Sequence, residues 1–305
     1  MSRLRSAGAF VLLSAVWGTA FTVIKIGLEY LPPVLFAAIR YDVAAVFMLG
    51  YAAVRADHWR PRSYRDWLAI LTGGVFVIGL YNAFLFLGQQ GVSSGVAAII
   101  VATNPILATV FSRGLLPSNR LRPIGVVGLA LGFLGVGLVA RPDPGALLGD
   151  GFLYPGLVLL AAVAVALGSV LIEWLDAGIG TVGIVAWSTV IGAVVLHVIS
   201  AGLYREPLSG LEFTPMAILA VAYLGIVASA FGYAIYFSLL ARVGAIEINL
   251  VSYAAPAFAA TAGWLLLGET LDILAVAGFA AIFAGFVLVK RRALRAELET
   301  LAASL

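Results

Sequence analysis

Lys25 is a cation inside a long apolar run, and Glu29 follows it one helical turn later in the segment "FTVIKIGLEY". A charge in hydrocarbon is expensive, so such a residue either reaches water or binds something. Two interpretations stay open. The ammonium reaches the interface and pairs with Glu29 at i+4, or it binds the carboxylate of a small molecule, which cannot be buried cheaply without a partner. For the second in-span cation, Arg40, a fixed structural pair is expected.

Aromatic and polar side chains in other runs could build a binding site around this cation. Phe21 lies one turn before Lys25 on the same helical stripe, with Trp17 beside it. Pro105 and Pro256 each leave a backbone carbonyl without its usual donor, which is tolerated only beside protein or water. We predict a mostly apolar cavity with a few polar groups, although packing or lipid contact is the alternative for each ring. The candidate substrate-binding residues are Trp17, Phe21, Lys25, Tyr81, Asn82, Phe84, Asn104, Ser229, Tyr233, Tyr236, Ser252 and Tyr253.

The composition places these residues in a membrane. The chain has 305 residues, of which 63% are hydrophobic and 11% charged, against roughly 25% charged residues in a soluble domain. The apolar runs are continuous rather than alternating and are about as long as a bilayer-spanning helix, which indicates helices and not barrel strands. The predicted fold class is therefore an all-α polytopic membrane protein. The first run is too long for a signal peptide and is predicted to be a retained span.

Ten spans can be counted, with short connections rich in glycine, proline and charge. No connection is long enough for a soluble domain, so the whole chain is predicted to form one membrane body. The predicted spans are 6–29, 33–54, 66–90, 94–116, 121–140, 152–174, 180–203, 214–241, 245–268 and 271–290.

The lysines and arginines predict the orientation. With the N-terminus inside, fourteen of the eighteen basic residues fall in cytoplasmic segments, and only Arg141 and Arg205 fall in outer loops. This asymmetry predicts that both termini are cytoplasmic. The net charge of +3 comes from these anchors, so it does not indicate nucleic-acid binding.

The two halves of the chain repeat one another. "NPILATVFSRGLL" at 104–116 aligns with "APAFAATAGWLLL" at 255–267, and Gly128 and Gly135 align with Gly278 and Gly285, at an offset of 150 or 151 residues. The predicted repeats are 1–145 and 146–305, with five spans each. Because five is odd, the second repeat is inverted, an arrangement typical of secondary transporters with a midplane site between the halves. The glycine spacings predict close helix packing.

The sequence resembles the drug/metabolite transporter superfamily, ten-helix EamA type. The resemblance rests on the 5+5 arrangement, "WG" in the first span, "AAIRY" in the second, the prolines of spans four and nine, and "GWLLLGETLDILAVAGFAAIFAGFVLV" at 263–289. The family often carries Gly-Glu after span four, where this chain has "LPSN". The resemblance implies export of amino acids, aromatic or other neutral ones, by a multi-pass protein of the bacterial inner membrane.

Other classes of function find less support. An intramembrane enzyme would need a nucleophile–base pair or two facing acids at mid-depth, and a channel would need a filter. Metal binding is not expected, since His197 has no ligand partner at metal spacing, and no cofactor is expected. Phosphorylated substrates would call for more in-span cations than Lys25 and Arg40. The expected partners are a small uncharged or zwitterionic molecule and the lipid bilayer, and a monomer is the expected unit. Drug export, another metabolite, channel-like facilitated flux and proton antiport remain alternatives.

The topology can be tested with cysteines, because the natural chain has none. Cysteines introduced at Ser63 and Ser209 should react with membrane-impermeant maleimide from opposite sides, Ser63 from the cytoplasm. Labelling of both positions from one side would contradict the ten-span arrangement.

Overall fold

The computed structural model describes residues 3–116, 123–140, 150–207, 211 and 213–303. The connections at 117–122 and 141–149, and the labelling position Ser209, lie outside these residues. Within the described chain all regular structure is helical, which confirms the predicted all-α class.

The helices of the first half run up to the connection at 141–149. They are α1 (Arg3–Gly27), α2 (Pro33–Arg55), α3 (Tyr64–Thr72), the π-helix η1 (Gly73–Leu80), α4 (Tyr81–Gly88), α5 (Ser94–Val101), α6 (Asn104–Leu115) and α7 (Pro123–Ala140). The helices of the second half follow. They are α8 (Asp150–Leu175), α9 (Thr181–Val198), the π-helix η3 (Ile199–Tyr204), α10 (Pro215–Ala222), the π-helix η4 (Tyr223–Phe231), α11 (Gly232–Asn249), α12 (Val251–Leu267) and α13 (Ile273–Ala303).

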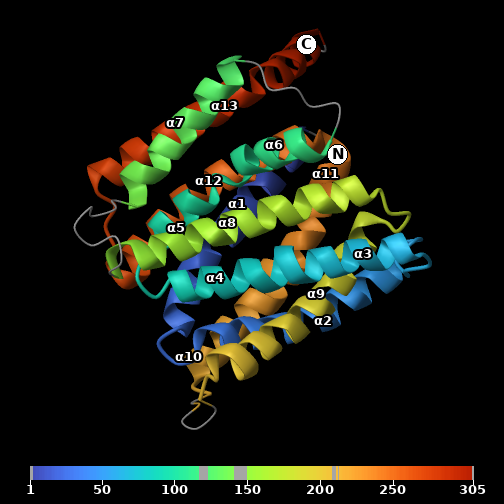
Figure 1. Cartoon of the computed structure of the whole chain (residues 1–305), viewed down its shortest axis with the longest axis vertical. Helices are drawn as coiled ribbons and strands as arrows, with labels where there is room; N and C mark the ends of the chain where they lie inside the picture. Colours follow the sequence, from blue (N-terminus) through green and yellow to red (C-terminus); the bar gives the residue numbers. More distant parts are fainter. Residues whose placement is uncertain (1–2, 117–122, 141–149, 208–210, 212, 304–305) are drawn as a thin grey trace.

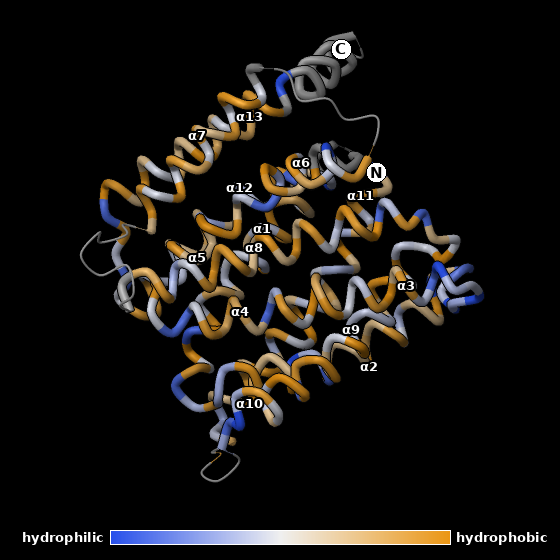
Figure 2. The backbone as a smooth tube through the Cα atoms, viewed as in Figure 1, coloured by the Kyte–Doolittle hydropathy of each residue, from blue (hydrophilic) through white to orange (hydrophobic). Residues whose placement is uncertain are grey.

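Within the described chain, seven long apolar helical stretches and three shorter apolar helices lie at the positions of the ten predicted spans. Seven continuous helical stretches of the described chain could cross a membrane by length and composition, and three shorter apolar helices supply the others, at Gly125–Ala140, Val251–Leu267 and Ile273–Val289. Figure 2 shows hydrophobic residues along the helices and hydrophilic ones gathered in the connections, most clearly between α2 and α3. Large apolar side chains such as Val54, 80% exposed, lie on the outside, as a lipid-facing surface requires.

The repeat is visible in the local structure. The π-helices η1 and η4 begin at Gly73 and Tyr223, 150 residues apart, in the third span of each half. The helices that lead into them begin after equivalent N-caps, where Ser63 and Thr214 each accept a hydrogen bond from a backbone N–H three residues on.

The halves differ around spans four and nine. In the first half a connection separates α4 from α5, and Pro105 lies in the first turn of α6 after a break at Ala102 and Thr103. In the second half the predicted connection at 242–245 is helical, because α11 continues to Asn249. That prediction was wrong. Gly244 is the only breaker in that stretch of sequence, and a single glycine does not end the helix, which continues to Asn249.

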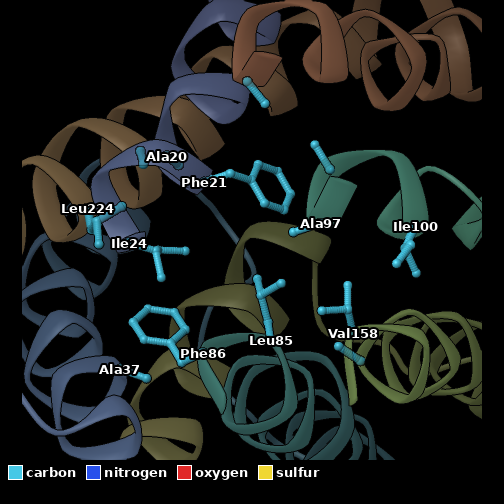
Figure 3. Packing of buried hydrophobic residues seen from close by; sticks show 14 of the residues in the cluster. Ala20, Phe21, Ile24, Ala37, Leu85, Phe86, Ala97, Ile100, Val158 and Leu224 are labelled. Carbon is cyan, nitrogen blue, oxygen red and sulfur yellow. The ribbon is translucent and has the colours of Figure 1, made fainter. Parts of the chain in front are cut away.

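Contacts between the halves hold the bundle together. The three most extensive helix contacts each join a helix of one half to a helix of the other: α1 with α12, α2 with α9, and α7 with α13. The α7–α13 pair runs along one flank of the bundle (Figure 1). The largest buried cluster also draws on both halves, with Phe21 and Ile24 of α1, Phe86 of α4 and Leu224 of η4 among its members (Figure 3).

Four glycines bring α7 and α13 into backbone contact. A Cβ added at Gly135 would lie 2.6 Å from the carbonyl oxygen of Gly278, and one at Gly278 would lie 2.6 Å from that of Gly135. Gly128 and Gly285 face one another in the same reciprocal way, at 2.6 and 2.5 Å. The earlier glycine of one helix meets the later glycine of the other, so the helices are antiparallel about a local two-fold axis. The predicted close packing is confirmed, and each glycine meets the non-equivalent glycine of the other repeat, as a two-fold axis between equivalent helices requires.

Replacing Gly135 with alanine should destabilise the protein, because the new methyl would collide with backbone that cannot move aside. Overpacking of this kind typically costs about 1–3 kcal/mol. Gly137, two residues on, has no described atom within 4 Å of an added Cβ and provides the control. We expect Gly135→Ala to lower the melting temperature in detergent and Gly137→Ala to leave it unchanged or raise it. Equal melting temperatures would contradict the contact.

Candidate functional site

Arg40 of α2 lies at the centre of a group of polar and aromatic side chains from both halves. It is seven residues into its helix, about 10 Å from the first residue at the helical rise, and its side chain is only 9% exposed. Its Nη1 donates to Asn82 Oδ1 of α4 over 3.5 Å, and its Nη2 donates to Ser229 Oγ of η4 over 3.3 Å. The guanidinium therefore bridges the third span of each repeat.

Aromatic rings surround the guanidinium. Its central carbon lies 4.9 Å from the centroid of the Tyr41 ring and 5.8 Å from that of Phe86, within the range of cation–π attraction. Tyr81 and Tyr233 also lie close enough to interact electrostatically with Arg40. Both tyrosines keep partial solvent exposure. We call Trp17, Arg40, Tyr41, Tyr81, Asn82, Phe86, Ser229, Tyr233 and Tyr236 the Arg40 cluster.

Local hydrogen bonds orient the two groups that Arg40 contacts. Asn82 is fully buried, and its amide nitrogen donates to the carbonyl of Ile78 over 2.8 Å and to the hydroxyl of Tyr41 over 3.2 Å. The amide oxygen is left to face Arg40. Ser229 donates to the carbonyl of Leu224, five residues earlier, over 2.8 Å. That spacing exists because η4 is a π-helix.

Trp17 of α1 links the cluster to the second half. Its indole Nε1 donates to the carbonyl of Ala228 over 3.0 Å. Its ring stacks on Tyr236 at 5.6 Å and meets the edge of Tyr233 at 6.1 Å. A Cβ at Gly232 would lie 2.7 Å from that nitrogen, so the glycine makes room for the indole.

The structure brings together half of the predicted site residues. Trp17, Tyr81, Asn82, Ser229, Tyr233 and Tyr236 belong to the Arg40 cluster. Others lie elsewhere. Phe21 and Phe84 pack in the adjoining apolar core, Asn104 begins α6 and Ser252 lies near the start of α12, and Tyr253 packs against Phe283 and Phe286 of α13.

Three members of the cluster were missed by sequence reasoning. Arg40 was expected to form a fixed structural pair, Tyr41 was noted only as part of "AAIRY", and Phe86 was not singled out. Among the described residues no carboxylate pairs with Arg40. For Arg40 the sequence did hold a signal, because a charged residue within a membrane span by itself indicates function.

Lys25 has partners other than Glu29. Its ammonium donates to the carbonyl oxygens of Gln89, over 3.2 Å, and Val92, over 2.6 Å, in the α4–α5 connection. The Gln89 side chain donates in return to the carbonyl of Phe21 over 2.9 Å. Glu269, which attracts Lys25 electrostatically, accepts the backbone N–H of Ser94 over 2.9 Å. Lys25 thus fastens the α4–α5 connection to α1. The pair with Glu29, one of the two interpretations left open by the sequence, is not formed among the described residues.

Asp42 is the acid closest to Arg40 along α2, and it is engaged elsewhere. Its carboxylate lies 2.9 Å from Nε2 of His197 on α9, with both side chains about half exposed. This pair ties α2 to α9 at the periphery. The described residues include no group of three His, Cys, Asp or Glu side chains that could hold a metal ion.

Comparison with known proteins places this arrangement in a family. The model of the EamA-like transporter family matches residues 5–141 and again 154–291, which together span nearly the whole chain. The chain belongs to the EamA-like transporter family. The expected resemblance is thereby confirmed, as is the two-repeat membrane fold.

Several relatives of this EamA-like transporter are also named as transporters. An uncharacterized transporter of Archaeoglobus fulgidus is 27% identical over 90% of this chain and 95% of its own length. The uncharacterized inner membrane transporter YedA of Escherichia coli K12 is 29% identical over 87% of this chain and 84% of its own. A solved crystal structure superposes with a TM-score of 0.65 at 22% identity, covering 97% of this chain and 100% of the other, and shows the same fold.

Replacing Lys25 with methionine should destabilise the transporter, because two carbonyls lose a charged donor. A hydrogen bond to a charged group contributes about 1.5–3 kcal/mol. The melting temperature should therefore fall, while Lys25→Arg, which keeps charge and donors, should lower it less. The ratio of phenylalanine to phenylalaninamide transport should stay at the wild-type value. A lowered ratio with normal stability would instead assign Lys25 to the substrate carboxylate.

Proposed function

We propose that this EamA-like transporter exports small neutral or zwitterionic metabolites, with amino acids as the main class, by alternating access across the bacterial inner membrane. The observation that carries the proposal is the Arg40 cluster. It joins α1, α2 and α4 of one repeat to η4 and α11 of the other, so movement between the repeats would open or close it. A site between repeats is where such folds bind their substrates.

The side chains of the cluster favour this substrate class. Aromatic residues surround the guanidinium of Arg40, the amide of Asn82 and the hydroxyl of Ser229. They are Trp17, Tyr41, Tyr81, Phe86, Tyr233 and Tyr236. Rings of this kind pack against apolar or aromatic side chains, and the few polar groups fix orientation. The described cluster holds one cation, which is too little charge for a phosphorylated metabolite. Aromatic drugs also fit the rings and form the second candidate class.

The proposed location and orientation follow from charge. The connection between α2 and α3 carries Arg55, Arg60, Arg62 and Arg65, as expected of a cytoplasmic segment. Export rather than uptake is inferred from the family resemblance. The described residues of the Arg40 cluster include no carboxylate that could carry a proton. Transport with and without a pH gradient distinguishes flux down the substrate gradient from proton antiport.

Transport should saturate with substrate and depend on the cluster. Purified protein in proteoliposomes, loaded with radiolabelled phenylalanine, should release it by a saturable route, measured with and without a pH gradient. Tyr81→Leu and Tyr233→Leu keep bulk but remove the hydroxyl and ring, and should change rate or substrate preference about tenfold or more, the scale of one well-placed contact. Tyr64→Leu is the control, because Tyr64 is 77% exposed at the start of α3.

Two outcomes would contradict this proposal. Non-saturating flux at channel-like rates would indicate a facilitator without alternating access. Normal transport by both cluster variants would place the substrate path elsewhere in the bundle.

A further inference from the structure

We infer that Arg40 is the residue that binds the carboxylate of the transported molecule. The inference rests on the proposed function and deepens it, since it names the group that recognises the substrate and the chemical class recognised. It assigns to Arg40 the role that one of the two open interpretations of the sequence gave to Lys25.

The hydrogen-bonding capacity of Arg40 is largely unused. A guanidinium has five N–H donors and cannot be deprotonated in a protein. Two of its nitrogens make contacts of 3.3 and 3.5 Å, near the limit for a hydrogen bond. The third nitrogen, Nε, is buried and has no partner among the described residues. The side chain is more than nine-tenths buried, so water cannot supply the remaining acceptors freely.

The charge of Arg40 is also uncompensated within the described chain. Its neighbours Asn82 and Ser229 are neutral, and the rings of Tyr41 and Phe86 supply only cation–π attraction. The acid closest along α2, Asp42, contacts His197. A buried charge is costly unless it is paired and hydrogen-bonded. A ligand that brings one negative charge would complete the site.

A carboxylate matches this guanidinium better than other anions do. Its two oxygens fit the guanidinium fork in a bidentate pair, and one negative charge balances one positive charge. A phosphate would bring more negative charge than the single cation of the described cluster can balance. The rings of Trp17 and Tyr233, which belong to the same cluster, are available to the rest of the molecule.

Lys25 is less suited to the role. Its ammonium already donates to two carbonyls at 2.6 and 3.2 Å and is attracted by Glu269. A carboxylate would have to displace these partners. Within the described chain Arg40 has no backbone acceptor or acid to lose, and it contacts side chains of both repeats, as a substrate-binding residue in this fold should.

Wild-type protein gives the first test. Phenylalanine and phenylalaninamide share every group except the carboxylate, so competition for radiolabelled phenylalanine in detergent should show the acid binding at least about tenfold more tightly, as one charge-assisted pair requires. Equal affinity, or tighter binding of the amide, would overturn the role of Arg40. If neither compound binds or crosses the membrane while another solute class does, the proposed function itself fails.

The second test supplies Arg40 with a carboxylate of the protein's own. Asn82→Asp is isosteric and places an acidic oxygen where the amide oxygen now lies, 3.5 Å from Nη1. We expect loss of phenylalanine binding by about tenfold or more, the scale of one charge-assisted pair, with phenylalaninamide binding retained. In this variant the second carboxylate oxygen would face the carbonyl oxygen of Ile78, and the two would repel one another. Ser229→Asp avoids that contact, because it places a carboxylate beside Arg40 from the other repeat. Retained preference for the acid in either folded variant would overturn the inference.

Two further variants complete the experiment. Gln90→Glu makes the same amide-to-acid change at an exposed position just beyond α4, and should keep the wild-type preference for the acid. Arg40→Lys keeps the charge but loses the planar fork, and should weaken phenylalanine binding while sparing the amide. A purely structural Arg40 would instead lower stability and change the binding of both compounds together.

Discussion

A chain that crosses hydrocarbon must satisfy its backbone without water, and this constraint governs where the helices may deviate. The π-helical segment η4 is one such deviation, and its residues Leu224 and Ser229 are buried inside the bundle. Its wider turn allows Ser229 to bond the carbonyl of Leu224 while facing Arg40. The same departure from regular geometry thus satisfies the backbone and positions a side chain of the candidate site.

Charged side chains in the bundle must also find partners without water. Lys25, Glu269 and Glu206 are each held by backbone groups, and Glu206 accepts the N–H groups of Val34 and Leu35 at the start of α2. These contacts tie helix ends and connections together and leave little capacity for a ligand. Arg40 differs because side chains surround it, and side chains can rearrange. If Arg40 binds the substrate as proposed, the structural charges differ from it in having backbone groups rather than side chains as their partners.

Composition and run length were enough to predict a helical membrane protein, and the offset of 150 was enough to predict its repeat. Predictions that depended on neighbours distant in sequence fared less well. The i+4 rule paired Lys25 with Glu29, whereas its acceptors come from a connection more than sixty residues away. Proximity to Pro256 placed Tyr253 in the site, whereas α12 turns that ring toward α13. Asn82 and Tyr81 do lie in the Arg40 cluster, because polar groups at mid-span have few alternatives to the interior of the bundle. Packing across the bundle determines how each helix is rotated and which side chains meet. A short stretch of sequence does not contain that information.

The glycine contacts between α7 and α13 have a consequence for the origin of the chain. Gly135 meets Gly278 and Gly128 meets Gly285, so each repeat presents the same patch to the other. Such an interface is isologous, the kind made by two identical subunits in a closed dimer. Two separate five-span proteins inserted in opposite orientations could make the same contact without any change of residue. The flank of this bundle therefore has the form of an antiparallel homodimer interface whose subunits are joined in one polypeptide.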